Sequence, residues 1–168
     1  MKDSSLIEKV LSRRVFDSRG NPTIEVEVIT KSGASGRAIC PSGASTGNNE
    51  ALEIRDNDDR YNGRDIKRGL DLIKNKISKL IVGVSCEDQS KFDKILKDFD
   101  GSDQKKIIGG NVSTSLSIAN YLCASNLNNI PAFDFHARSK NLKIPKPEIQ
   151  IFGGGAHSGN QNSFQDFL

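Results

Sequence analysis

The hydrophobic period of this chain changes from two residues to between three and four, and that change limits the possible folds more than any other feature. Residues 23–30 (Thr-Ile-Glu-Val-Glu-Val-Ile-Thr) alternate polar and apolar side chains, as a half-buried strand does. A turn-rich stretch, 31–36, leads to a short apolar segment at 37–40, and residues 10–16 are a further candidate strand before them. This order predicts a three-stranded antiparallel meander in the N-terminal quarter.

From Gly63 onward the apolar residues recur at helical spacing. One face of a first helix is predicted to contain Ile66, Leu70, Ile73, Ile77 and Leu80. A second helix is predicted over 87–99, ending at Asp100-Gly101, and a third over about 111–126. The expected buried stripe of the third helix is Leu116, Ala119, Leu122 and Cys123. Strands followed by a helical bundle predict an α+β domain with helices on one face of an antiparallel sheet.

The character of the sequence changes again near residue 131. Residues 133–138 predict a last short helix, and 139–146 form a polar connector punctuated by proline. We therefore expect two domains, 1–140 and 141–168. In the second, residues 147–152 predict one strand for which the sequence offers no partner.

Length and charge exclude several classes of protein. With 168 residues the chain is too short for a complete eight-fold α/β barrel of roughly 250 residues. A net charge of +3 with interleaved signs argues against nucleic-acid and membrane-surface binding. The first residues lack the apolar core of a signal peptide, and the longest apolar run, Leu80 to Val84, is far short of a membrane span. We expect a cytoplasmic protein.

The three cysteines do not predict a disulfide framework or a zinc site. Cys40, Cys86 and Cys123 are odd in number, widely spaced and never in a Cys-x-x-Cys pair. We expect them to be small buried hydrophobic residues.

Three segments contain residue types that could bind a ligand or take part in catalysis, although each can also be interpreted as an ordinary turn or loop. Residues 17–22 (Asp-Ser-Arg-Gly-Asn-Pro) are typical of a turn between strands. Residues 40–50 are rich in Gly, Ser and Thr, which suits a phosphate or Mg²⁺ but also a flexible connector. Residues 153–160 place a histidine in a glycine-rich loop, where a ligand can approach the backbone closely. The acidic run 56–59 lacks the spacing of a calcium loop and predicts a solvated turn.

Taken together and in this order, the segments resemble the enolase family. The matching stretches are Asp17-Ser-Arg-Gly-Asn-Pro-Thr23, Pro41-Ser-Gly-Ala-Ser-Thr-Gly47 with Glu50-Ala-Leu-Glu-Ile-Arg-Asp56 behind it, Ile108-Gly-Gly-Asn111, and Gly154-Gly-Ala-His157 leading to Gln165-Asp-Phe167. The resemblance covers nearly the whole chain from about Ser12, and several long motifs in register are far more specific than any one of them.

The resemblance implies an Mg²⁺-dependent lyase that interconverts 2-phosphoglycerate and phosphoenolpyruvate in glycolysis. It implies that Ser45 coordinates a Mg²⁺ ion through its hydroxyl and carbonyl oxygens, and that Ser42 and Ala44 contact the substrate. It also implies that His157 approaches the substrate phosphate. Asp166 falls where enolases have a Glu near the leaving hydroxyl, so its carboxylate is one methylene shorter than the family pattern.

The resemblance further assigns 1–140 to an N-terminal capping domain and 141–168 to the first strand and loop of a truncated α/β barrel. In the family, three metal-binding carboxylates, the Lys base and the principal Glu acid lie downstream of this point, so we expect this chain alone to be inactive. Enolases assemble as homodimers or larger rings, and Arg13 and Glu25 match positions in the dimer interface.

Two alternatives stay open at this point. Asp166 and the segment Gln150-Ile-Phe152 depart from the family pattern, which allows a paralogue that acts on a related phosphonate or phosphate. A non-catalytic capping or dimerisation module is the second alternative.

Overall fold

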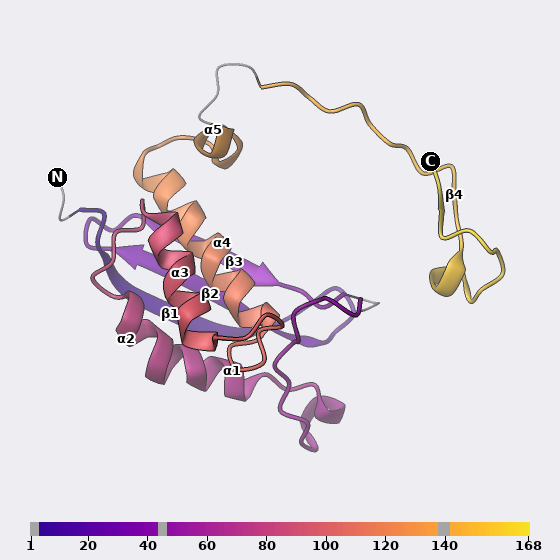
Figure 1. Cartoon of the computed structure of the whole chain (residues 1–168), viewed down its shortest axis with the longest axis horizontal. Helices are drawn as coiled ribbons and strands as arrows, with labels where there is room; N and C mark the ends of the chain where they lie inside the picture. Colours follow the sequence, from indigo (N-terminus) through magenta and orange to yellow (C-terminus); the bar gives the residue numbers. More distant parts are fainter. Residues whose placement is uncertain (1–3, 44–46, 138–141) are drawn as a thin grey trace. The chain divides into compact units, whose positions relative to one another are not determined.

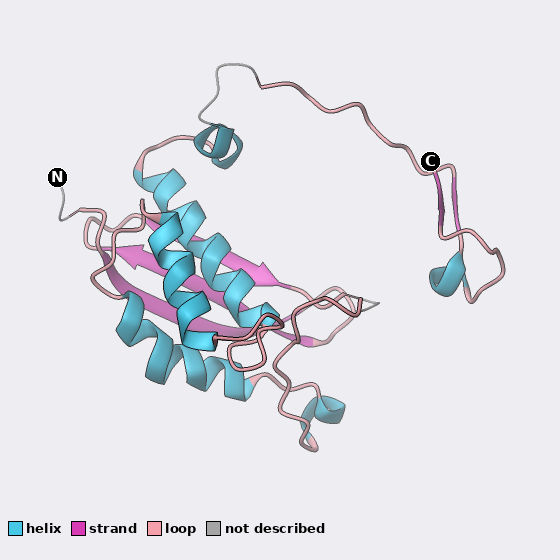
Figure 2. Ribbon diagram, viewed as in Figure 1, coloured by secondary structure: helices cyan, strands magenta, loops and turns pink. Residues whose placement is uncertain are grey.

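The computed structural model describes residues 4–43, 47–137 and 142–168. The chain divides into two compact units, Met1–His136 and Ala137–Leu168, and each is described here by itself. The sequence placed the domain boundary after residue 140, in a stretch outside the described residues. Figure 1 traces the order of the elements, and Figure 2 shows the helices of the first unit gathered against its sheet.

The sheet of the first unit is the predicted meander. It consists of β1 (Ile7–Phe16), β2 (Pro22–Thr30) and β3 (Ser35–Cys40), in the order β1-β2-β3 with both pairings antiparallel. Successive side chains of the central strand point to opposite faces of the sheet. Ile24, Val26 and Val28 are therefore on the face that meets the helices, where they are fully buried. The prediction of an α+β fold with a three-stranded antiparallel sheet is confirmed.

The turn between β1 and β2 confirms the structural interpretation of its sequence. One carboxylate oxygen of Asp17 accepts the backbone N–H groups of Arg19 and Asn21, both at 2.9 Å. Gly20 has a φ of +76°, a conformation that glycine adopts without steric cost. The bond from the Asn21 N–H is the main cause that holds the pKa of Asp17 below its usual value.

The first predicted helix is a composite of several short pieces. After the separate turn η1 (Arg60–Gly63), the pieces are α1 (Lys67–Leu72), the π-helical turn η2 (Ile73–Ile77) and α2 (Ser78–Ile81). In the π-helical turn, the N–H and the Oγ of Ser78 both donate to the carbonyl of Ile73. The wider turn places residues four apart on the same face of the helix. Ile73, Ile77 and Ile81 therefore all face the core and are fully buried. The predicted position of Leu80 in the buried stripe is wrong, since its side chain is 47% exposed.

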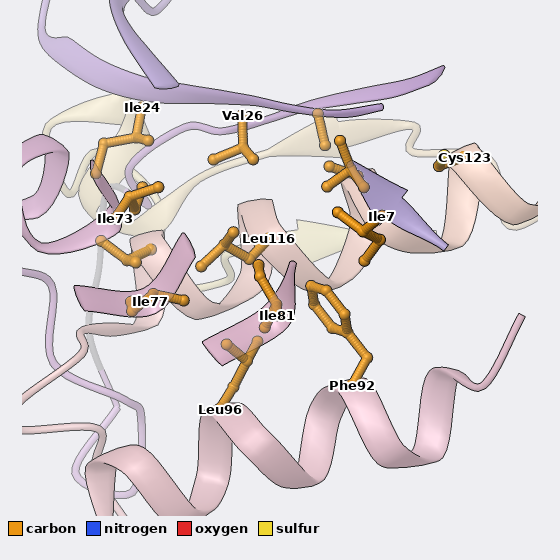
Figure 3. Packing of buried hydrophobic residues seen from close by; sticks show 14 of the residues in the cluster. Ile7, Ile24, Val26, Ile73, Ile77, Ile81, Phe92, Leu96, Leu116 and Cys123 are labelled. Atoms are coloured by element: carbon orange, nitrogen blue, oxygen red, sulfur yellow. The ribbon is translucent and has the colours of Figure 1, made fainter. Parts of the chain in front are cut away.

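The remaining helices of the first unit agree with the predicted spacing. They are α3 (Gln89–Asp100), α4 (Gly110–Leu127) and α5 (Ala132–Ala137). Gly101 ends α3 in the left-handed conformation, as its position predicts. In the predicted stripe of α4, Leu116, Ala119 and Cys123 are buried, whereas Leu122 is half-buried. α4 lies across β2 and β3, and Figure 3 shows Leu116 beside Ile81, Phe92 and Leu96 in the core between sheet and helices.

The second unit is a small hairpin. β4 (Phe152–Gly153) pairs antiparallel with β5 (Asp166–Phe167), and the short helix η3 (Gly155–Ser158) lies between them in the sequence. The prediction of a strand over 147–152 without a partner is wrong, because only Phe152 belongs to β4 and the chain itself supplies the partner strand. The rings of Phe152 and Phe167 stack with their centroids 4.7 Å apart. None of the helices in the described ranges is both long enough and apolar enough to cross a membrane.

The register set by the π-helical turn yields a first test. Ile81→Ala should lower the free energy of unfolding by about 2–5 kcal/mol, since it leaves a cavity in the core. Leu80→Ala, the adjacent control, should change it by about 0.5 kcal/mol, since much of that side chain already meets solvent. Urea unfolding of the two variants measures the difference. Equal losses would contradict the register described here.

Candidate functional site

Arg55 ties together the two ends of the segment that carries the Ser-Gly-Ala-Ser-Thr motif. Its largely buried guanidinium donates through Nη1 to the carbonyls of Pro22 and Arg64, at 2.6 and 2.8 Å. Nη2 donates to the Oγ of Ser42 and, at 2.9 Å, to Oε2 of Glu53. The Oγ of Ser42 in turn donates to the same Glu53 oxygen at 2.9 Å. Ser42, directly after β3, is therefore held beside the turn that precedes β2.

The Ile-Gly-Gly-Asn motif holds the second end of the same segment on the start of α4. The Asn111 side chain accepts the Ile54 N–H at 3.0 Å and donates to the Ile54 carbonyl at 3.1 Å. Gly109 has a φ of +80°, and a Cβ on it would lie 2.7 Å from Cγ1 of Ile54. The carbonyl of Leu52 accepts the N–H of Gly110 at 2.7 Å. These contacts explain why the motif needs a glycine at 109 and an asparagine at 111.

Asp100 organises the turn that leads into this motif. Its Oδ2 accepts the N–H groups of Ile107 and Ile108 at 2.9 and 2.6 Å, and its Oδ1 accepts the N–H and the hydroxyl of Ser102. Burial opposes ionisation of Asp100, but these donors, led by the Ile108 N–H, outweigh it and hold the pKa below its usual value. Sequence analysis missed this role. The available signal was an acidic residue directly before a helix-ending glycine.

Three carboxylates of the first unit lie close together, and their bonding does not fit a magnesium site. Oxygens of Asp56, Asp58 and Asp65 lie within 4.8 Å of one another. Asp56 accepts two backbone N–H groups at the start of α1, at 2.7 and 2.9 Å, and Asp58 accepts the Arg60 N–H at 3.0 Å. Asp65 is buried and meets the Arg14 guanidinium at 2.8 Å. These carboxylates already bind donors that a cation would have to displace, and Asp56 and Asp58 belong to the turn predicted over 56–59.

In the second unit, Asp166 lines a hollow of about 430 Å³. The hollow is bounded by Gln150, Gly153, Gly154, Ser158, Gln165 and Asp166. The Asp166 carboxylate accepts a hydrogen bond from the Gln150 Nε2. A Cβ on Gly154 would lie 2.1 Å from the Phe164 carbonyl oxygen, so only glycine allows this close approach. The hairpin can therefore present a carboxylate and an amide together to a small polar ligand.

Three other predicted site residues lie partly or wholly outside the part of the chain that the structure describes. Ala44 and Ser45 lie outside the described residues. His157 lies in η3, and its side chain is outside the described part. Gln150, which sequence analysis did not assign to the site, is the side chain that contacts Asp166.

Arg13 and Glu25, the predicted interface residues, pair with each other within this chain. They lie opposite one another in the register of β1 and β2, and their Nη1 and Oε1 atoms are 2.9 Å apart. Arg13 also reaches Glu27 at 2.6 Å, and Arg37 lies 3.6 Å from Glu25. The sheet thus carries a ladder of alternating charge on the face opposite the helices.

A three-stranded meander covered by helices, with a glycine-rich hairpin after it, defines the class of domain that begins an enolase. The family model described as "Enolase, N-terminal domain" matches residues 7–135. A protein named "Enolase" from Pelagibacter ubique (strain HTCC1062) is 42% identical over 165 residues, or 98% of this chain. The chain spans 39% of the length of that relative. The chain belongs to the enolase family, a family of lyases.

Arg55→Lys tests the link between the two ends of the 42–55 segment. Lysine keeps the charge but cannot reach Ser42, Pro22 and Arg64 together, because it lacks the planar fork. We expect faster amide exchange in the peptide that contains residues 47–52, measured by mass spectrometry. Arg68→Lys, on an exposed side chain, is the matched control and should leave exchange unchanged. Unchanged exchange in both variants would disprove the anchoring role of Arg55.

Asp100→Asn tests the buried turn through its pH dependence. At pH 7 the variant should lose about 1–3 kcal/mol of unfolding free energy, since it replaces a charged acceptor of four donors. Because the folded pKa of Asp100 is lowered, its stabilisation is present above the unfolded value and is lost as pH falls through the folded value. The difference between wild type and variant should therefore shrink at acid pH, below about 4. Asp98→Asn, on an exposed side chain, is the control; a constant difference across pH would contradict the assignment.

Proposed function

We propose that this chain forms the N-terminal domain and the beginning of the barrel of an enolase that dehydrates 2-phosphoglycerate to phosphoenolpyruvate in glycolysis. The observation that carries the proposal is the similarity along 98% of the chain to one enolase, with the family motifs in register. The cytoplasm, where glycolytic substrates are found, is the proposed location. The proposed activity is that of the complete enzyme. This chain covers 39% of the length of the Pelagibacter ubique relative.

The proposed contribution of the first unit is one end of a substrate clamp. Ser42 and Ala44 contact the substrate, and Ser45 supplies oxygen ligands to Mg²⁺, which are the donors this ion prefers. A Mg²⁺ ion held there would supply positive charge to offset the negative charge that develops on the substrate. The network of Arg55 supports this role, because it holds Ser42 in place at the start of the segment.

The proposed contribution of the second unit is a polar group near the leaving hydroxyl and a charge near the phosphate. Asp166 orients the leaving hydroxyl, and His157 approaches the phosphate. The Gln150 amide supports this role for Asp166, because it donates to the carboxylate and limits its rotation. The side chain of Asp is one methylene shorter than that of Glu, and a displacement of about 1 Å in a reacting group can cost about 100-fold in rate.

We also propose that copies of the enzyme associate through the face of the sheet opposite the helices. In the complete enzyme, Arg13 and Glu25 belong to the interface of a homodimer or a larger ring. Glu25 is only 7% exposed, and Arg13 and Arg37 flank its carboxylate as ion-pair partners. The side chains of Arg13 and Arg37 are 42% and 62% exposed, so they are the groups of this ladder that a partner can reach.

A non-catalytic capping module is the second candidate function. It is favoured by one observation, which is that the core of the first unit is built from its own strands and helices. A paralogue that acts on a related phosphonate or phosphate shares the chemistry of the first proposal and differs only in substrate.

The chain by itself should form no phosphoenolpyruvate from 2-phosphoglycerate and Mg²⁺. The reason is that the clustered carboxylates in the described ranges are already engaged by protein donors. The ultraviolet absorbance of phosphoenolpyruvate measures turnover, and the Pelagibacter ubique enolase is the positive control. Turnover by the isolated chain would overturn this expectation.

A chimera tests the proposed activity directly. The 168 residues replace the matching segment of the Pelagibacter ubique enolase, and the folded chimera should dehydrate 2-phosphoglycerate. Asp166→Glu in the chimera should raise kcat by up to about 100-fold, and Asp166→Asn should lower it. A chimera that folds, by circular dichroism, and is inactive with both Asp and Glu would favour the module. Turnover of a phosphonate analogue in preference to 2-phosphoglycerate would favour the paralogue.

A further inference from the structure

A pocket of about 270 Å³ lies between α3 and α4 in the first unit. The two helices pack against each other, and residues 101–109 connect them (Figure 1). A water molecule takes up roughly 30 Å³ in the liquid, so the pocket has room for about nine non-hydrogen atoms of that size. The lining residues that determine what it can bind are Asp93, Leu96, Lys97, Lys105, Ser117 and Ile118. None of these six belongs to the site proposed for the enzymatic reaction.

Two of these residues provide an apolar surface. Leu96 is part of the hydrophobic core and only 4% exposed, whereas Ile118 is 42% exposed. The methylene groups of the lysine side chains add apolar area to the lining, because a lysine is apolar up to its ammonium group. A ligand with an aliphatic body would remove the exposed part of Ile118 from water, and burial of apolar surface favours binding.

Lys97 brings a positive charge to the pocket that no carboxylate of the described residues neutralises. Lys94, on the same helix, forms an ion pair at 2.7 Å with Asp98, four residues later. The residue four positions after Lys97 is Gly101. Asp93, four positions before it, accepts a hydrogen bond from an amide of the same helix at 3.0 Å, and no ion pair joins it to Lys97 in the described structure. The Lys97 ammonium is therefore available to an anionic ligand.

Lys105 adds a second ammonium from a turn that other contacts hold in place. Asp100 organises this turn, and the carbonyl of Lys105 accepts the N–H of Gly109 at 2.8 Å. The Nζ of Lys105 donates one N–H to the carbonyl of Ser102 at 3.3 Å and has two more to donate. The Oγ of Ser117 accepts a hydrogen bond from α3 at 3.1 Å, so its own O–H can donate as well. Groups that are in place before a ligand arrives lower the entropic cost of binding.

We propose that the pocket between α3 and α4 binds a small aliphatic monocarboxylate. The carboxylate accepts hydrogen bonds from the ammonium groups of Lys97 and Lys105 and from the Ser117 hydroxyl. The aliphatic body of the ligand lies against Leu96 and Ile118. With two lysines and one aspartate, the lining has an excess of one positive charge, which a monocarboxylate neutralises. No covalent bond forms or breaks, and the proposal is independent of the proposed enzymatic activity.

Titration of the isotope-labelled 168-residue chain with hexanoate, followed by amide chemical shifts, tests the site. We expect saturable shifts at residues 93–97 and 113–118, with a dissociation constant of about 5 mM or tighter. Acetate carries the charge without the aliphatic body, and hexanol carries the body without the charge. Each of these two compounds should bind more than about threefold more weakly than hexanoate. The proposal is overturned if these residues show no such hexanoate binding, or if acetate or hexanol binds as well as hexanoate does.

Variants separate the pocket from general attraction of anions to the chain. Lys97→Gln and Lys105→Gln should each weaken hexanoate binding at least about threefold, since each removes a charge-assisted hydrogen bond. Lys94→Gln is the matched control and should leave the affinity unchanged, because its ammonium pairs with Asp98 and does not line the pocket. Ile118→Ser should also weaken binding, and circular dichroism checks that each variant folds. An effect of Lys94→Gln equal to that of the other two lysine variants, or no effect of those two, would overturn the proposed site.

Discussion

Burial of one face of the central strand β2 against α4 is the interaction on which the rest of the structure depends. Ile24, Val26 and Val28 exclude water on that face, and a slip of one residue would turn all three outward. The same register pairs Phe16 with Pro22 and Ile24 with Cys40. The turn before β2 and the segment after β3 therefore lie at the same end of the strands. This neighbourhood allows one guanidinium to bind both.

Several residues of the enolase motifs act in this structure as hydrogen-bond partners of the backbone. Asp17 closes a turn, Asn111 completes the bonds of Ile54, and Arg55 joins three separate segments. Buried backbone groups are costly when they lack partners, so side chains that satisfy them determine how a loop is held. The motifs are thus informative about family because they preserve a scaffold, and the chemistry proposed for Ser45 and His157 needs that scaffold to be in place.

The differences between expectation and structure have identifiable physical causes. The helix prediction assumed a uniform period of 3.6 residues, and the π-helical turn at 73–77 brings Ile81 into the core in place of Leu80. The strand predicted over 147–152 is short because β5 supplies only Asp166 and Phe167 as partners, opposite Gly153 and Phe152. The contact of Gln150 with Asp166 depends on the antiparallel return of the chain, which periodicity does not report.

Local patterns in the sequence were sufficient for the meander, for most boundaries of α3 and α4, for the turn over 17–22, for the helix cap at Gly101, and for the family. These features depend on residues within a few positions of one another, and periodicity and turn chemistry report such short-range preferences directly. Only the tertiary structure decided that Arg55 reaches Pro22, that Arg13 pairs with Glu25, and that Asn120 reaches the carbonyl of Cys86. Those contacts join segments whose separation in space is set by packing of the whole core, and the order of residues along a chain does not contain that distance in any local form.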